Sequence, residues 1–333
     1  MGRINEVVVI DLSQVERALG SYAITEIRDL RLCANGIINT NYVVQTEDSV
    51  YLLRIYNEDR DLEGILFEIS ILEYLSQAGF IVQRPIQNTA GEYLGLLEGR
   101  EFVLLQYIEG EVLAQADINP TLCFQVGVRL AEMENLLDGF IPKGHKPDAD
   151  YPLIKDLALK NLDRLSKLGA EGKRVAEELR SDWYEVEKLF RNPGLSKGVV
   201  HADIYYQNVI VRDGELVGFI DFDDSYWGVR FYDLALVLME FSIKQEGSME
   251  MELLEALLSG YQQKRQLLKE ERSLLYDAMR FLCFKFLGYT AELDEFAGKL
   301  LLTNGYIHRL VYFRDPAVRV QFDAVLTSID RER

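Results

Sequence analysis

The stretch that decides the fold is VVHADIYYQNVIVRDGELVGFIDFDDSYWGVRFYD, at residues 199–233. Within it, Asp203 is followed five positions later by Asn208, and a second carboxylate, Asp221, ends the apolar segment LVGFI. Turn residues at 212–215 predict that two short β-strands meet there in a hairpin. A carboxylate at the end of an apolar strand is costly unless a cation meets it. The spacing therefore predicts a polar functional site held on short strands.

These three polar side chains suit phosphoryl transfer. That reaction needs a carboxylate near the attacking hydroxyl, oxygen ligands for magnesium, and a cradle for the triphosphate. Asp203 would orient the hydroxyl or accept its proton, while Asn208 and Asp221 would bind Mg²⁺. Taken alone, Asp203 would more simply cap a turn, but the combined spacing of the three residues favours a catalytic role.

The residues after this strand are candidates for substrate contacts. In an extended chain Asp223 would point to the same side as the metal-binding carboxylate, where it could hold a second metal or face the substrate. Asp223 and Asp224 could equally form a solvated acidic turn. With Trp227 they could meet an ammonium group by charge and cation–π contact, and Tyr206 could line the same wall.

Two further residues of the stretch are expected to be structural. We expect the imidazole of His201 to form hydrogen bonds that shape the loop around it. Asp233 opens an apolar helix, where it could be the N-cap or accept backbone N–H bonds from the catalytic loop.

The first third of the chain predicts an antiparallel β lobe interrupted by one helix. Its strands are rich in β-branched and aromatic residues and are bounded by turn residues. Apolar residues at helical spacing predict the helix over 61–78, with Gly79 as its stop. The five expected strands span 25–35, 40–47, 49–57, 82–88 and 101–107.

Arg54 lies in the centre of the strand VYLLRIY. A charge in an otherwise apolar strand needs a partner, and we expect Arg54 to contact the α- and β-phosphates with Glu68 as the orienting acid. Glu63 and Glu73 lie on the same predicted helix and are alternatives to Glu68. The competing interpretation is a surface arginine on an edge strand.

Two other parts of this lobe are candidates for nucleotide binding. Gly36, with Asn39 and Asn41 between two strands, could cradle phosphates through backbone N–H groups. The P-loop pattern GxxxxGK[ST] is absent from the sequence. The segment near Gln106 and Ile108 would contact the nucleotide where the first lobe ends.

A polar break at 109–111 is the expected hinge. It predicts a nucleotide-binding lobe at 1–107 and a mostly helical catalytic and substrate-binding lobe at 108–333, which together make an α+β architecture. Asn119 and Pro120 have the residue types of an N-cap and a first helical position. The expected helices span 121–138, 153–166, 171–190, 230–245, 250–266, 269–288 and 291–302.

Composition limits the partners. The 333 residues include 54 acids and 36 bases, for a net charge of −18, which argues against nucleic acid or an anionic membrane. A solubilising surface is the commoner cause of such a charge, although a cationic substrate also fits. The three cysteines lack CxxC spacing, and we find neither a signal peptide nor an apolar run of 18 residues, so we expect a cytoplasmic location. Composition leaves the oligomeric state open.

The motifs HADxxxxN from His201, IDF around Asp221 and YDLA around Asp233 resemble the aminoglycoside phosphotransferase/choline kinase-like superfamily, whose fold is protein-kinase-like. In motif the chain is most similar to its bacterial homoserine kinase type. The resemblance implies ATP or GTP as donor, Mg²⁺, and a small, usually amine-bearing acceptor. It makes Asp203 the base, Asn208 and Asp221 the metal ligands, and Arg54 with Glu68 the nucleotide-lobe pair.

Among the places where the sequence departs from the superfamily pattern, two bear directly on the site. Arg54 stands where many relatives have lysine, which keeps the charge but changes the geometry. Ala202 replaces the commoner glycine. The first hypothesis is therefore an ATP- and Mg²⁺-dependent kinase of a small amino-alcohol, with homoserine as the first candidate. The alternatives are an aminoglycoside or choline/ethanolamine kinase, a Ser/Thr protein kinase of the same superfamily, and a non-catalytic binding protein on a kinase fold.

Overall fold

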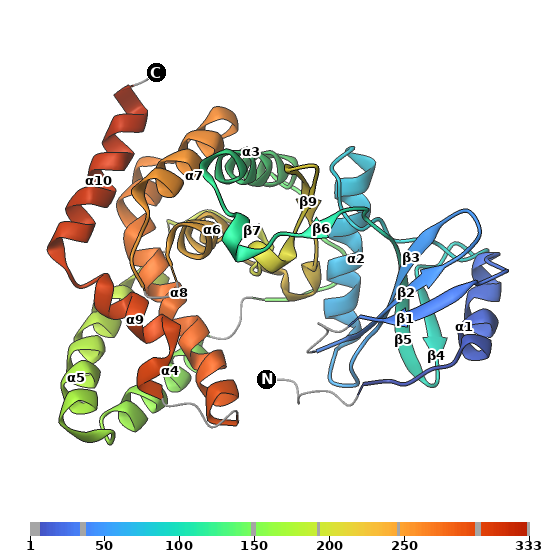
Figure 1. The fold of residues 1–333 in the computed structure, drawn as a ribbon, viewed down its shortest axis with the longest axis horizontal. Helices are drawn as coiled ribbons and strands as arrows, with labels where there is room; N and C mark the ends of the chain where they lie inside the picture. The colour runs from blue at the N-terminus through green and yellow to red at the C-terminus, as the bar shows by residue number, and fades with distance from the viewer. Residues whose placement is uncertain are drawn as a thin grey trace. The chain divides into compact units, whose positions relative to one another are not determined.

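The chain forms two compact units in the computed structural model (Figure 1). The structure describes residues 7–33, 38–147, 151–191, 194–244, 247–296 and 301–331. One unit comprises Met1–Gly110, Ile141–Lys146 and Gly218–Asp223, and the other comprises Glu111–Phe140, Pro147–Val217 and Asp224–Arg333.

The first unit is built on a five-stranded antiparallel sheet, counted over the described residues, in the order β1-β2-β3-β5-β4. Its helices are α1 (Leu12–Leu19) and α2 (Leu62–Gln77), with a short 3₁₀ turn at Gly20–Tyr22. The strands are β1 (Asp29–Leu32), β2 (Thr40–Gln45), β3 (Val50–Ile55), β4 (Leu94–Leu97) and β5 (Arg100–Gln106).

The prediction of a strand over 82–88 was wrong. All of these residues are described, yet they form no strand, and Pro85 makes only an isolated bridge to Leu105. Proline has no N–H to donate to a ladder, which disfavours a strand through this position. The missing edge strand is β4, whose turn into β5 is made by Glu98 and Gly99, both at positive φ. Two such residues form the tight turn that matches the twist of a β-hairpin.

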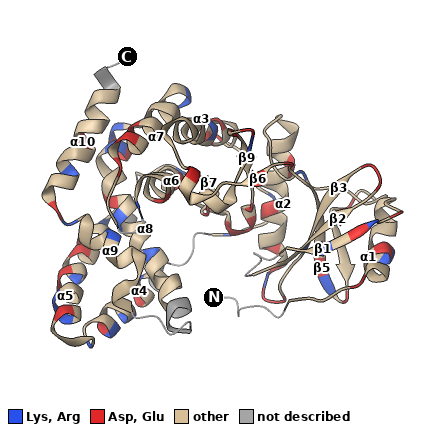
Figure 2. Cartoon of the chain, viewed as in Figure 1, with Lys and Arg blue, Asp and Glu red and all other residues tan. Residues whose placement is uncertain are grey.

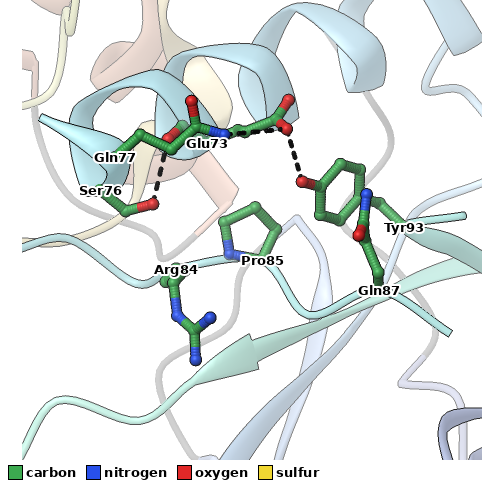
Figure 3. Close-up of a pocket in the computed structure, with 7 residues that line it drawn as sticks. All are labelled: Glu73, Ser76, Gln77, Arg84, Pro85, Gln87 and Tyr93. Carbon is green, nitrogen blue, oxygen red and sulfur yellow. Dashed lines mark hydrogen bonds between the residues drawn. The ribbon is translucent and has the colours of Figure 1, made fainter. Parts of the chain in front are cut away.

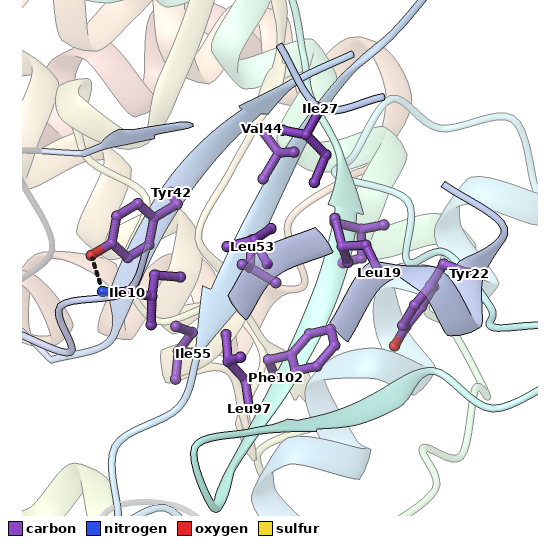
Figure 4. Packing of buried hydrophobic residues seen from close by; sticks show 12 residues of the cluster. Ile10, Leu19, Tyr22, Ile27, Tyr42, Val44, Leu53, Ile55, Leu97 and Phe102 are labelled. Carbon is purple, nitrogen blue, oxygen red and sulfur yellow. Dashed lines mark hydrogen bonds between the residues drawn. The ribbon is translucent and has the colours of Figure 1, made fainter. Parts of the chain in front are cut away.

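One face of this sheet carries the apolar core of the unit (Figure 4). Burial alternates along β2, so that one set of its side chains faces this core. Helix α1 brings Leu19 to the same cluster, where Leu53 of β3 and Phe102 of β5 lie beside it, and the Tyr22 ring lies 5.8 Å from the Phe102 ring. Each such buried side chain stabilises the fold by about 1.5–3 kcal/mol.

Two later chain segments complete this unit. In the segment 141–146, the Lys143 N–H donates to the Ser70 hydroxyl of α2 over 3.0 Å. Gly144 has φ +78°, and a Cβ there would lie 2.2 Å from the carbonyl oxygen of Glu63, so only glycine allows this close approach to α2. The segment 218–223 carries the candidate metal ligand.

The second unit is mostly helical. The prediction of Asn119 as N-cap and Pro120 as first helical residue is confirmed, because the Asn119 side chain accepts a hydrogen bond from the Leu122 N–H. Its helices are α3 (Pro120–Leu136), α4 (Tyr151–Leu165), α5 (Gly169–Val186), α6 (Tyr232–Ser242), α7 (Met251–Lys264), α8 (Lys269–Phe296), α9 (Gly305–Tyr312) and α10 (Pro316–Arg331). Acidic and basic residues are interspersed along α5, as is typical of a solvated face (Figure 2).

The prediction of separate helices at 269–288 and 291–302 was wrong, because α8 runs from Lys269 to Phe296 without a break. Gly288 lies inside it and packs against Leu157 of α4, so tertiary packing offsets the low helix propensity of glycine. Helices α9 and α10 were not predicted.

Short strands surround the catalytic-loop sequence. The predicted hairpin is present as β8 (Val209–Arg212) and β9 (Glu215–Phe219), in a sheet of order β6-β8-β9 with β6 (Glu111–Val112). A second pair, β7 (Lys197–Val200) with β10 (Tyr226–Val229), was not predicted. The remaining 3₁₀ turns lie at Gln115–Asp117, Glu187–Arg191, Tyr206–Asn208, Phe222–Asp224 and Leu301–Thr303.

Candidate active site

Asp203 and Asn208 meet in the loop between β7 and β8. The 3₁₀ turn Tyr206–Asn208 folds the chain back, so that the Asn208 side-chain Nδ2 donates to the Asp203 carbonyl oxygen over 2.8 Å and to its Oδ2 over 2.7 Å. This turn therefore brings together two residues that are five positions apart in the sequence. Asn208 is buried and Asp203 is half-buried, so the amide fixes a carboxylate that remains accessible.

The start of this loop is held by Asp233 at the N-terminal end of α6. Its two carboxylate oxygens accept the backbone N–H groups of His201 over 2.6 Å and of Ala202 over 2.8 Å. Burial raises the pKa of Asp233 to about 6, although the two N–H bonds oppose that rise. His201 is fully buried, and its Nδ1 accepts the Asp203 N–H over 3.3 Å. The structural interpretation of His201 is confirmed. For Asp233 the prediction that it accepts loop N–H bonds is confirmed, whereas the alternative of an N-cap was wrong, because the N-cap of α6 is Phe231.

Arg54 is the centre of a buried polar network in the first unit. Its side chain is 3% exposed, on a strand flanked by β2 and β5, so the alternative of a surface arginine on an edge strand was wrong. Its Nη1 donates to Glu68 Oε1 over 2.8 Å, its Nη2 to Asp221 Oδ1 over 2.7 Å, and its Nε to Asn41 Oδ1 over 3.2 Å. One guanidinium thus binds a carboxylate of α2 and the candidate metal ligand.

Glu68 is the acid of α2 that pairs with Arg54. Of the two alternatives, Glu73 accepts the Tyr93 hydroxyl and Glu63 lies in the first turn of α2. Glu68 also accepts the Tyr56 hydroxyl over 3.0 Å. Burial raises the pKa of Glu68, and Arg54 opposes this rise without cancelling it.

Asp223 does not extend from the strand as the sequence suggested, because Phe222–Asp224 is a 3₁₀ turn. Its side chain is buried, so the alternative of a solvated acidic turn was wrong for this residue. Asp223 Oδ2 accepts Asn39 Nδ2 over 2.7 Å and Arg60 Nη2 over 2.8 Å. Burial alone would raise the pKa of Asp223, but the positive charges of Arg54, Arg60 and Lys146 lower it below its usual value.

Sequence reasoning missed Arg60 and Lys146. Arg60 precedes the N-cap of α2 among other charged residues, and Lys146 lies 77 positions before Asp223, so neither carried a local signal. Arg60 Nη1 donates to the Asp223 carbonyl oxygen over 2.9 Å, and Lys146 Nζ donates to the same oxygen.

The other candidate nucleotide contacts are placed as follows. Asn39 is buried, and its Oδ1 accepts the Asn57 N–H over 3.2 Å, so its side chain is used within the fold. Gly36 lies outside the described residues. Gln106 ends β5 and accepts Arg84 Nε over 3.2 Å, and Ile108 is half-buried just after it.

The candidate substrate contacts of the second unit are partly accessible. Tyr206 and Trp227 are half-buried, on the 3₁₀ turn of the loop and on β10 respectively, and Asp224 is half-buried beside β10. The Tyr206 ring packs edge-on against Tyr205, with the ring centres 5.6 Å apart.

Each candidate ligand, taken by itself, has the chemistry that magnesium carried by a nucleotide requires. Among the described residues, no group of three or more His, Cys, Asp or Glu side chains could hold a metal ion. Mg²⁺ in kinases needs less from the protein, because it keeps waters and phosphate oxygens and takes one or two protein oxygens. The Asp221 side chain is 37% exposed and Asn208 offers an amide oxygen, which matches that requirement.

A small pocket of about 150 Å³ lies at the end of α2 (Figure 3). Its walls are Glu73, Ser76, Gln77, Arg84, Pro85, Gln87 and Tyr93. It contains none of the candidate site residues and is smaller than the usual 300–1,000 Å³ of ligand pockets. We therefore assign it no part in the chemistry.

The sequence is similar to known phosphotransferases. The model of the phosphotransferase enzyme family (APH) matches residues 29–269. Homoserine kinase of Methylobacillus glycogenes is 28% identical over 315 residues, covering 92% of this chain and 91% of the relative. Homoserine kinase of Chelativorans sp. (strain BNC1) is 28% identical over 336 residues, covering 92% and 95%.

Solved structures share the fold. A microcompartment-associated aminopropanol kinase superposes with a TM-score of 0.69 at 19% identity, covering 90% of this chain and 95% of that one. The amicoumacin kinase hAmiN gives 0.67 at 19% identity, covering 95% and 94%.

Two general properties follow for the chain. Over the described residues, no helix is both long and apolar enough to span a membrane. The homoserine kinase relatives imply ATP as the phosphoryl donor and a small molecule as the acceptor. With its protein-kinase-like α+β fold and a family match over residues 29–269, the chain belongs to the phosphotransferase enzyme family and is a kinase that acts on an alcohol group.

Proposed function

We propose that this kinase is Mg²⁺-dependent and phosphorylates the hydroxyl of a small amine-bearing metabolite, with homoserine as the first candidate. The observation that carries this proposal is the loop in which Asn208 and Asp233 hold the segment around Asp203. Homoserine kinases that align with 92% of the chain support the choice of acceptor.

Asp203 is the proposed catalytic carboxylate. It orients the acceptor hydroxyl and takes its proton while the hydroxyl oxygen bonds to the γ-phosphorus and the bond to the bridging oxygen of ADP breaks. Because the transition state is loose, orientation is the larger part of this role. The double hydrogen bond from Asn208 keeps Asp203 in one position, which supports that role.

Asn208 and Asp221 are the proposed magnesium ligands. Bound Mg²⁺ would neutralise charge on the β- and γ-phosphates. Asp221 is suited to this because Arg54 holds one of its oxygens in a fixed direction while the side chain stays partly exposed. Asn208 is suited because its Nδ2 is fixed on Asp203, which sets the direction of its amide oxygen.

The nucleotide is proposed to bind the first lobe, residues 1–107, with the remaining lobe, 108–333, supplying the loop and the acceptor site. Arg54, oriented by Glu68, would contact the α- and β-phosphates. The other proposed contacts are Gly36, Asn39, Gln106 and Ile108. On the acceptor side we retain Asp224, Tyr206 and Trp227 as candidates for binding an ammonium group, whereas the buried Asp223 is already bonded within the fold.

The test is ADP release with a panel of acceptors. L-homoserine, choline, ethanolamine, 1-aminopropan-2-ol and an aminoglycoside would be compared by kcat/KM at saturating ATP and Mg²⁺. We expect homoserine to exceed each of the others by at least about tenfold, because the relatives that align with 92% of the chain are homoserine kinases. A higher value for choline or for an aminoglycoside would refute homoserine as the acceptor. If ATP binds but none of the acceptors is phosphorylated, the assignment of Asp203 as a catalytic carboxylate is refuted.

A further inference from the structure

The backbone of the candidate metal ligand is strained. Asp221 has φ +69°, in the left-handed region, which residues other than glycine adopt uncommonly and aspartate more often than most of them. A non-glycine residue keeps such a conformation only where its surroundings determine it. The contacts around Asp221 must therefore hold the segment in this shape.

Those contacts converge on Asp223, two residues further on. Arg60 donates two hydrogen bonds to Asp223, from Nη1 to the backbone carbonyl oxygen over 2.9 Å and from Nη2 to Oδ2 over 2.8 Å. Lys146 donates to the same carbonyl oxygen, and Asn39 donates to Oδ2 over 2.7 Å. Both the backbone and the side chain of Asp223 are thus fixed.

The donors come from separate parts of the sequence. Asn39 and Arg60 precede Asp223 by 184 and 163 positions, and Lys146 precedes it by 77. Lys146 follows Gly144, whose close approach to α2 anchors the segment 141–146. The turn that follows Asp221 is therefore tied to the residue before β2, to the residues before α2 and to that segment.

We propose that Asp223, Arg60 and Lys146 form a clasp that positions the carboxylate of Asp221 for magnesium, so that all three are positioning residues for phosphoryl transfer. This inference rests on the proposed role of Asp221. Arg54 fixes Asp221 from the side-chain end, and the clasp fixes it from the backbone end. We assign Asp223 to the clasp because its Oδ2 accepts two hydrogen bonds inside the fold and its carbonyl oxygen accepts two more.

The test measures metal affinity rather than activity. Binding of Mn²⁺ would be followed by electron paramagnetic resonance in the presence of a non-hydrolysable ATP analogue, and binding of the analogue alone would be measured in EDTA. For Arg60→Ala we expect Mn²⁺ affinity to fall at least about tenfold while analogue affinity in EDTA changes less than about threefold. Arg60→Lys should fall between wild type and Arg60→Ala, because lysine lacks the planar fork that reaches both acceptors.

Matched variants separate positioning from loss of fold. Asp223→Asn keeps the shape of the side chain and should also weaken Mn²⁺ binding, with kcat falling and KM for the acceptor unchanged. Arg28→Ala breaks an exposed ion pair with Glu47 in the same unit and should bind Mn²⁺ as wild type does. Thermal midpoints of all variants would be recorded alongside.

The two hypotheses fail in different ways. Asp221→Ala provides the reference, because it should abolish Mn²⁺ binding if the metal assignment is right. If Asp221→Ala loses Mn²⁺ while Arg60→Ala and Asp223→Asn stay within twofold of wild type, the clasp is wrong and the metal assignment stands. If Asp221→Ala binds Mn²⁺ normally, the proposed metal ligand itself is wrong, and the clasp with it.

Discussion

Replacing Arg54 by alanine should destabilise the first unit strongly and in a pH-dependent way. The side chains of Arg54 and Glu68 are 3% and 4% exposed, so the substitution leaves a buried carboxylate without its cation. Breaking a buried ion pair by removing one partner typically costs about 3–5 kcal/mol. We expect a loss of that size in the free energy of unfolding at about pH 8, where the unpaired Glu68 would have to ionise in the interior.

The direction in which this loss of stability changes with pH follows from the pKa of Glu68. The pKa of Glu68 is already raised in the wild type, and without Arg54 it should rise further. A raised pKa means that its contribution to stability is complete below the unfolded value of about 4.3 and is lost as pH rises through the folded value. The cost of Arg54→Ala should therefore shrink as pH falls from about 8 to about 5, because protonated Glu68 needs no cation.

Hydrogen exchange of the β2 and β3 amides is a suitable assay, because it reports the opening of the first unit separately from the rest of the chain. The double variant Arg54→Ala/Glu68→Gln is the control, and it should recover part of the stability at about pH 8, since no buried charge remains. A loss under about 1 kcal/mol at pH 8, or the same loss at both pH values, would refute the interpretation of Glu68 as a buried carboxylate that depends on Arg54.

Three further predictions follow from the second unit. Asp203→Asn should lower kcat by about 10² or more while ATP still binds, which rapid-quench and equilibrium binding would show; near-normal turnover would remove Asp203 from the mechanism. Ala202 has φ +72°, so Ala202→Gly should raise the unfolding free energy by up to about 1 kcal/mol in urea titrations, and a loss would contradict the strain. Burial raises the pKa of Glu134 to about 8, so the unfolding free energy of the wild type should decline as pH rises from the ordinary pKa of a glutamate through 8. Glu134→Gln should lack that decline. If the variant shows the same pH dependence of stability as the wild type, the assignment to Glu134 is wrong.

The contacts within the catalytic-loop stretch are local, so the sequence could indicate that these residues lie together. Asp203, Asn208 and Asp233 lie within one stretch, and their mutual bonds follow from one turn and one helix start. Glu68 could be narrowed only to one of three acids, because helical periodicity does not say which face meets Arg54.

Contacts between segments that are distant in the sequence could not be predicted from the sequence pattern. Arg60 and Lys146 reach Asp223 only because the segment 141–146 and the residues before α2 meet at one turn. The wrong strand at 82–88 has a related cause, since Val82 is buried and Ile86 half-buried without a ladder, and Pro85 was the local signal against a strand.

The presence of arginine at position 54, where many members of the superfamily have lysine, has a physical explanation. A lysine ammonium is a compact point charge, whereas a guanidinium presents separate donors in a fixed plane. Arg54 uses three of them on three acceptors, Glu68, Asp221 and Asn41, which lie on α2, on the segment after β9 and on β2. The same residue that is proposed to bind phosphate therefore also sets the direction of the proposed metal ligand. Arg54→Lys, although it conserves charge, should lose that second role, and its effect should appear in the magnesium dependence of nucleotide binding more than in the affinity for nucleotide alone.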